Sequence, residues 1–168
     1  PKYLNSPETP LFHKGRSLYN FTMAREASRD AGTVIVAEGY TDVIALAQAG
    51  LPNAVAPLGT ALTEDQMRLV WRVADEPVLC FDGDTAGERA ALRAAERALP
   101  LLQPGKTLRF MALPSGDDPD TLIKARGAEG FRKLLAGAHQ LVDVLWQSEV
   151  SAASHDTPER RADLERRI

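Results

Sequence analysis

Four short apolar segments lie in the middle of the chain, and a stretch with helical spacing follows each of them. Residues 33–37 form the first segment, whose β-branched side chains predict a buried strand. Residues 53–57, 77–81 and 107–113 repeat this pattern. Because strands that alternate with helices are joined by right-handed crossovers, we predict a parallel sheet of about four strands flanked by helices.

The segments between these strands predict the helices. A helix begins near Thr41 and ends at Gly50, and Thr63 with Gln66 forms a capping-box pattern that opens another. Further helices are predicted over residues 17–31 and 84–99, and then over 121–126, 129–135 and 140–149, before a highly charged segment. The predicted fold class is therefore α/β, with a sheet domain followed by a small helical subdomain.

Composition and termini narrow the class of protein. The 168 residues are 44% hydrophobic and 26% charged, as in an ordinary α/β domain with an appendage. No apolar run approaches the roughly 20 residues of a membrane-spanning helix, and no signal peptide is recognisable, so no membrane role is expected. Cys80 is the single cysteine and lies in an apolar strand, which favours a buried thiol in a reducing, cytoplasmic compartment. Because the chain lacks an initial Met and stops in a helical pattern, we expect a piece of a longer protein.

The net charge of −3 is unevenly distributed along the chain. Residues 1–32 hold five basic and three acidic side chains, whereas residues 33–150 hold eleven basic and sixteen acidic ones. Such an acidic region repels nucleic acid unless its carboxylates are neutralised.

Acidic side chains gather where three of the predicted strands end, at the edge where open parallel sheets bind their ligands. They are Glu38 and Asp42 after the first strand, Asp82 and Asp84 after the third, and Asp118 and Asp120 after the fourth. Six carboxylates in one cleft repel one another unless they are protonated or bound to cations. Hard oxygen ligands suit Mg²⁺ or Mn²⁺, so we predict a divalent-metal site for phosphoryl transfer.

Several of these side chains also have a purely structural interpretation. Asp42 can complement a helix dipole, and Asp84 and Asp120 can be helix N-caps. Glu38 follows an apolar strand directly and precedes Gly39, which favours function over packing. Asp117 is expected to be a solvated loop residue.

Two of the motifs, Glu38-Gly39 and Asp82-Gly83-Asp84, resemble the Toprim signature shared by bacterial primases, topoisomerases and some nucleases. Residues 38–43, 82–87 and 118–122, together with the opening segment 2–15, are similar to the corresponding stretches of bacterial DnaG-type primases. The resemblance runs from residue 1 to about residue 135.

This resemblance implies a nucleotidyltransferase that makes RNA primers from ribonucleoside triphosphates on single-stranded DNA. It implies Glu38, Asp82 and Asp84 as the central ligands of Mg²⁺ or Mn²⁺, with the other three carboxylates completing the site. The implied nucleotide- or DNA-binding residues are Lys2 and Lys14, with Tyr3, Asn5 and Arg16 as weaker candidates. A stripe formed by Arg89, Arg93 and Arg97 is expected to be a solvated helix face.

The resemblance also implies a division of the chain. Residues 1–32 would be a basic lead-in from a preceding catalytic subdomain, residues 33–125 the metal-binding Toprim domain, and residues 126–168 the start of a helical bundle. A zinc-binding domain and a domain that binds the replicative helicase are expected outside this chain, so the piece alone should prime weakly.

Two other functions remain open. A Toprim nuclease or topoisomerase fragment would cleave DNA, although Tyr3, Tyr19 and Tyr40 have no context that predicts a nucleophile. A non-catalytic Toprim module would only dock DNA or a helicase, and the presence of all six carboxylates argues against it.

Overall fold

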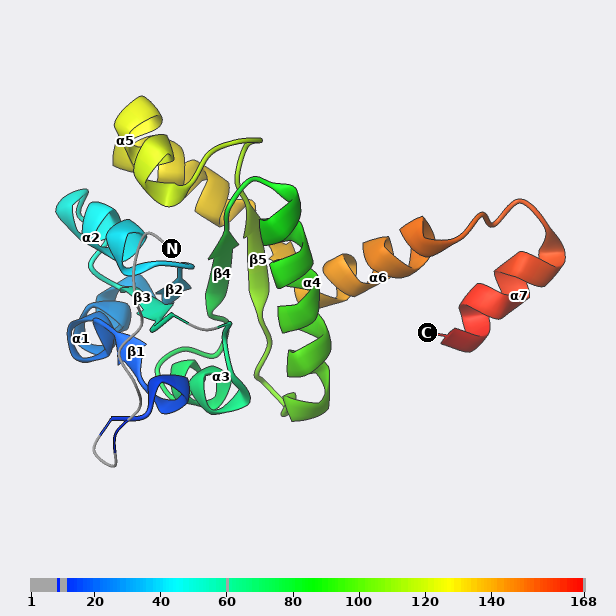
Figure 1. Cartoon of the computed structure of the whole chain (residues 1–168), viewed down its shortest axis with the longest axis horizontal. Helices are drawn as coiled ribbons and strands as arrows, with labels where there is room; N and C mark the ends of the chain where they lie inside the picture. Colours follow the sequence, from blue (N-terminus) through cyan, green and yellow to red (C-terminus); the bar gives the residue numbers. More distant parts are fainter. Residues whose placement is uncertain (1–8, 10–11, 60, 168) are drawn as a thin grey trace.

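A single six-stranded sheet organises the protein, whose computed structural model describes residue 9, residues 12–59 and residues 61–167. The strand order is β1-β3-β2-β4-β5-β6, of which Figure 1 labels β1 to β5. The four central strands are β2 (Ile35–Val36), β3 (Ala54–Pro57), β4 (Val78–Phe81) and β5 (Arg109–Ala112). They pair in parallel, which confirms the predicted α/β class and its four-stranded parallel core.

Two antiparallel edge strands extend this core beyond the prediction. β1 (Leu18–Tyr19) pairs with β3, and β6 (His139–Gln140) pairs with β5. The predicted helix over residues 17–31 is therefore wrong at its start, since α1 spans only Phe21–Ala31. Asn20 adopts a φ of 62° between strand and helix, and its Nδ2 donates to the carbonyl oxygen of Ala54 at 2.9 Å.

Helices cover both faces of the sheet because successive strand residues point in opposite directions. On one face, Val36, Leu79 and Phe110 pack with residues of α3 (Glu64–Val70), α4 (Thr85–Ala98) and α6 (Leu141–Ala152). On the other face, Ile35 and Met111 pack with residues of α2 (Tyr40–Gln48) and α5 (Pro119–Ala136). The remaining helical elements are η1 (Lys14–Arg16), η2 (Leu99–Leu101) and α7 (Pro158–Arg167).

The C-terminal third is helical, as predicted. α5 is interrupted at Gly127, whose φ of 64° and ψ of −178° separate the two predicted helical segments. α6 packs against α4 and β5 at its beginning, and α7 lies beyond its far end, away from the sheet (Figure 1). No helix among the described residues has both the length and the apolarity to cross a membrane.

Candidate metal centre

The predicted carboxylates lie on the loops and helix starts at the carboxyl ends of β2, β4 and β5. Glu38 follows β2 and is exposed, whereas Asp82 follows β4 and is partly buried. The backbone N–H of Asp82 donates to Glu38 Oε1 at 3.1 Å, which links the two loops. The hydrogen bond holds Glu38 beside the next strand end instead of leaving it free in solvent.

The loop after β4 is held against the loop after β5 by its glycine. Gly83 N donates to Asp117 O at 2.9 Å, and Gly116 N donates to Gly83 O at 2.8 Å. A Cβ atom at Gly83 would lie 1.9 Å from the carbonyl oxygen of Pro114, closer than any real contact. Glycine is therefore required for the approach that brings Asp82 and Asp118 to the same edge.

Three of the carboxylates also complete helix starts. Asp42 is buried and its Oδ2 accepts a hydrogen bond from Gly39 N at 3.1 Å. Asp84 is the N-cap of α4, where its Oδ1 accepts from Gly87 N at 2.7 Å. Asp118 is the N-cap of α5, and its Oδ1 accepts from Thr121 N at 2.7 Å.

The N-cap hypothesis is thus confirmed for Asp84 and wrong for Asp120. Pro119 occupies the first position of α5, where its fixed φ suits the helix, so the preceding Asp118 becomes the cap. Asp120 lies in the first turn and pairs with Lys124 at 2.6 Å.

The six carboxylates lie close enough for the charges of the others to raise the pKa values of Asp42 and Asp82. Burial, together with the charges of Asp118, Glu38 and Asp120, raises the pKa of Asp42 to about 6 against the lowering effect of the hydrogen bond from Gly39. Burial likewise raises the pKa of Asp82 to about 6, with contributions from the charges of Glu38, Asp42, Asp118 and Asp84. The fold thus gathers charges that favour a proton or a cation among them.

The donor set fits a hard divalent cation. Asp82 Oδ1 is buried and has no hydrogen-bond partner among the described residues, so one carboxylate oxygen is already shielded from water. As the side chains stand, no three His, Cys, Asp or Glu residues within the described part of the chain close around one point. Carboxylate oxygens are nevertheless the ligands that Mg²⁺ and Mn²⁺ prefer, and Glu38, Asp82 and Asp84 follow two strands that pair with each other.

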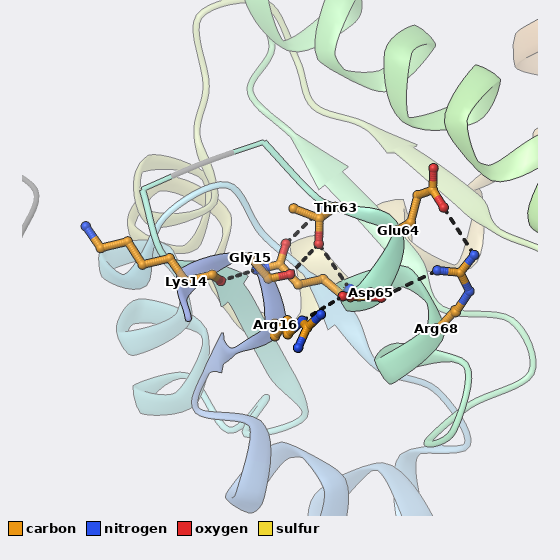
Figure 2. A network of polar contacts seen from close by, with 8 residues as sticks. Lys14, Gly15, Arg16, Thr63, Glu64, Asp65 and Arg68 are labelled. Atoms are coloured by element: carbon orange, nitrogen blue, oxygen red, sulfur yellow. Dashed lines mark hydrogen bonds and ion pairs between the residues drawn. The ribbon is translucent and has the colours of Figure 1, made fainter. Parts of the chain in front are cut away.

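The residues predicted to bind nucleotide or DNA differ in where the structure places them. Lys2, Tyr3 and Asn5 lie outside the described residues. Arg16 is exposed, and its Nε pairs with Asp65 of α3 at 3.1 Å, so the structure directs it to α3 (Figure 2).

The backbone around Lys14 is fixed by the start of α3. Gln66, fully buried, donates from Nε2 to the carbonyl oxygens of Lys14 and Ser17 at 2.9 and 2.8 Å. Thr63 Oγ1 donates to Gly15 O at 2.6 Å. Figure 2 shows the Lys14 side chain pointing away from this network. The sequence therefore placed the capping box of α3 correctly but missed that it anchors the basic segment.

The arginine stripe of α4 is not simply a solvated face. Arg93 and Arg97 line a hollow of about 400 Å³ together with Glu38. Arg97 Nη1 donates to the carbonyl oxygen of Leu62. The spacing of these arginines in the sequence indicated a shared helix face, but only the structure showed that Arg93 and Arg97 lie beside Glu38. Cys80 is buried as expected, and burial raises the pKa of its thiol.

Comparison with known families first defines the class. The family model of the Toprim domain matches residues 32–112, and that of the DNA primase catalytic core, N-terminal domain, matches residues 1–25. The strand order, the acidic edge of the sheet and these matches define a Toprim-containing primase core.

Individual relatives then specify the family. A DNA primase from Pseudomonas aeruginosa is 49% identical over 98% of this chain, which covers 25% of the relative. The crystal structure of a DNA primase domain from the same species matches with a TM-score of 0.91 and 49% identity, over 98% of this chain and 51% of that one. A DnaG primase catalytic domain bound to single-stranded DNA matches with a TM-score of 0.90 and 46% identity, over 98% of this chain and 53% of that one.

The chain belongs to the bacterial DnaG-type primase family, as a fragment of the catalytic core. It spans about a quarter of the length of the curated relatives it matches. These relatives do not favour the alternatives of a DNA-cleaving Toprim enzyme or a non-catalytic docking module.

Proposed function

We propose that this chain carries the metal-dependent nucleotidyl-transfer centre of a replicative primase. The enzyme would make short RNA primers on single-stranded DNA from ribonucleoside triphosphates. The convergence of six carboxylates on one edge of the sheet, with Asp82 Oδ1 buried and unpartnered, is the observation that carries this proposal.

In this proposal Glu38, Asp82 and Asp84 are the central ligands of Mg²⁺ or Mn²⁺, and Asp42, Asp118 and Asp120 complete the acidic site. A bound divalent ion supplies Lewis-acid stabilisation of the charge that develops on the reacting phosphates. The chain's own contribution is positioning: the Asp82 N–H fixes Glu38, and the cap hydrogen bonds fix Asp42, Asp84 and Asp118. No protein nucleophile is required.

The remaining parts of the chain receive supporting roles. Residues 1–32 are the basic lead-in, residues 33–125 the metal-binding domain, and residues 126–168 the start of a helical bundle. Lys2 and Lys14, with Tyr3, Asn5 and Arg16, contact nucleotide or template phosphates. The zinc site and the contact with the replicative helicase belong to other domains of a cytoplasmic protein, so this piece alone primes weakly.

Calorimetric titration with Mn²⁺ tests the site directly. The wild-type chain is expected to bind Mn²⁺, and Glu38→Gln and Asp82→Asn are each expected to weaken binding at least tenfold. Asp30→Asn, which removes an exposed carboxylate from α1, is the matched control and should leave binding unchanged. Unchanged binding in both site variants would overturn the ligand assignment.

Primer synthesis tests the remainder of the proposal. The isolated chain should give little product on a single-stranded template, whereas addition of the other catalytic segments should restore synthesis that depends on Glu38. Robust priming by the isolated chain would contradict the role given to the other segments.

A further inference from the structure

A second hollow lies on the opposite side of β5 from β4, between α5 and the edge strand β6. It has a volume of about 540 Å³, and its ionisable lining residues are Arg126, Lys133 and His139. No carboxylate from the part of the chain that the structure describes lines it. In a stretch of chain with a large acidic excess, a hollow whose ionisable lining residues are all basic is a distinct local feature.

The three basic side chains of the hollow are available for a ligand. Arg126, Lys133 and His139 make no side-chain hydrogen bond or ion pair within the described part of the chain. Other cations of α5 and its surroundings are engaged: Lys124 pairs with Asp120, and Arg109 Nη2 donates to the carbonyl oxygen of Ala138. Arg126 and Lys133 are therefore unpaired cations within the described part of the chain, and they leave a positive potential around the hollow that an anion can satisfy.

The backbone of α5 keeps the hollow open. Gly130 and Gly137 form part of its wall and carry no side chain to fill it. The stem of Arg126 lies against Gly130, where an added Cβ would meet Arg126 Cβ at 2.5 Å. The break at Gly127 begins a new helical segment there, and the positive end of its dipole adds to the charge of the side chains.

The hollow continues toward the carboxylates. Ala112 and His139 line it, and they also line the neighbouring hollow that contains Asp82 and Asp84. Neighbouring strands are about 4.8 Å apart, so β6 lies two strands, roughly 10 Å, from β4. A polyanion that reached the acidic edge of the sheet could rest on these cations without leaving the surface.

We propose that Arg126, Lys133 and His139 bind the phosphate backbone of single-stranded DNA next to the metal centre. The proposal rests on the function inferred above, which brings such a strand to this edge of the sheet. An extended strand fits better than a single small anion, because the basic residues come from the two segments of α5 on either side of Gly127 and from β6, around a hollow of about 540 Å³. The contacts are to phosphates, so the site has no base specificity.

Fluorescence anisotropy with a labelled single-stranded 12-mer, in EDTA and over a range of salt concentrations, tests this site. Each phosphate contact on a single strand contributes about 0.7 to the slope of log K against log salt, so Arg126→Gln/Lys133→Gln should lower the slope by about 1.4. The same variant should bind roughly tenfold more weakly at low salt. Lys133→Glu should weaken binding more than Lys133→Gln.

The matched control is Arg25→Gln/Arg29→Gln. It removes the same charge from α1, which packs against β3 toward the other edge of the sheet. Binding within twofold of wild type by this control supports the site. Three results would each overturn the proposed site. The first is an equal loss of affinity in both double variants, and the second is that the wild type does not bind the strand at low salt. The third is displacement of the strand by tripolyphosphate at the same molar concentration.

The outcome is separable from that of the metal proposal. EDTA removes divalent ions from the binding assay, so loss of Mn²⁺ binding in Glu38→Gln says nothing about the strand. Conversely, the substitutions at Arg126 and Lys133 should leave the Mn²⁺ titration unchanged.

Discussion

Replacing Asp82 by asparagine is expected to stabilise the metal-free chain while it destroys a metal ligand. Burial, and then the charge of Glu38, raise the pKa of Asp82 from 3.8 to about 6. Each pKa unit corresponds to about 1.36 kcal/mol, which gives an upper limit of ~3 kcal/mol for a fully buried group. Asp82 is only partly buried, and solvent screening reduces the expected gain to about 1–2 kcal/mol at pH 7.5.

The pH dependence of this gain follows from proton linkage. The folded chain holds the Asp82 proton more tightly than the unfolded chain, so this group contributes most stability below about pH 4. That contribution is lost as the pH rises through about 6. The advantage of Asp82→Asn should therefore be largest at pH 7.5 and should shrink at pH 4.5, where wild-type Asp82 is protonated.

Urea unfolding followed by circular dichroism measures this effect in EDTA at both pH values. Adding Mn²⁺ at pH 7.5 should reverse the order, because the metal binds the wild type more tightly and therefore stabilises it more than Asp82→Asn. Asp30→Asn should change stability by only a few tenths of a kcal/mol, as for exposed groups in general. The reasoning is refuted if Asp82→Asn is less stable than the wild type in EDTA at pH 7.5, or if its gain is the same at both pH values.

Three further changes probe the supports of the site. Gly83→Ala would place a Cβ 1.9 Å from Pro114 O and disrupt two backbone hydrogen bonds. We therefore expect the free energy of unfolding, measured in urea, to fall by about 2–4 kcal/mol. Gly137→Ala, the matched control, should be nearly neutral. A loss below 0.5 kcal/mol at Gly83, roughly the range of neutral surface changes, would contradict the steric argument. Gln66→Leu removes the partner of three buried or partly buried backbone groups and should cost about 3–5 kcal/mol. Gln66→Glu should be no milder, because it keeps the acceptor for Thr63 N but sets a buried carboxylate against the carbonyl oxygens of Lys14 and Ser17. Because the pKa of Asp42 is about 6, Mn²⁺ affinity should fall steeply below that pH, and a flat profile between pH 5 and 7.5 would argue against ionised carboxylate ligands.

The sequence predicted the elements whose signal is local and repeated. The four central strands are short apolar runs between helical stretches, and the structure places each of them in the parallel core. β1 and β6 have two residues each, too few for alternation to be visible, and they form only because β3 and β5 offer free edges. β2 is equally short, but it lies inside the apolar run of residues 33–37, whereas β1 and β6 lie in no such run and are set by tertiary pairing alone.

The candidate site shows the same limit at the level of side chains. The rule that ligands bind at the carboxyl ends of parallel strands was enough to predict that the carboxylates belong to one site. It did not indicate that Gly83 packs against Pro114, or that Arg16 pairs with Asp65, which is 49 residues away. Contacts between loops of distant sequence depend on how the elements pack, and that information is spread over the whole core.

Asp84 shows that a helix cap and a metal ligand need not be alternatives. Its Oδ1 accepts the hydrogen bond from Gly87 N, which leaves Oδ2 for a cation. Asparagine caps helices about as well as aspartate, whereas alanine loses about 1 kcal/mol at this position. Asp84→Asn should therefore keep the stability of the chain and lose Mn²⁺ affinity, while Asp84→Ala should lose both.

Urea unfolding in EDTA and Mn²⁺ titration of the two variants separate the roles. If Asp84→Asn retains wild-type Mn²⁺ affinity, Asp84 is a cap alone and the central ligands reduce to Glu38 and Asp82. If both variants lose the same stability, the charge on the carboxylate, and not its hydrogen bond to Gly87, is what supports the start of α4. Only the combination of retained stability and lost affinity in Asp84→Asn is consistent with one side chain that serves both purposes.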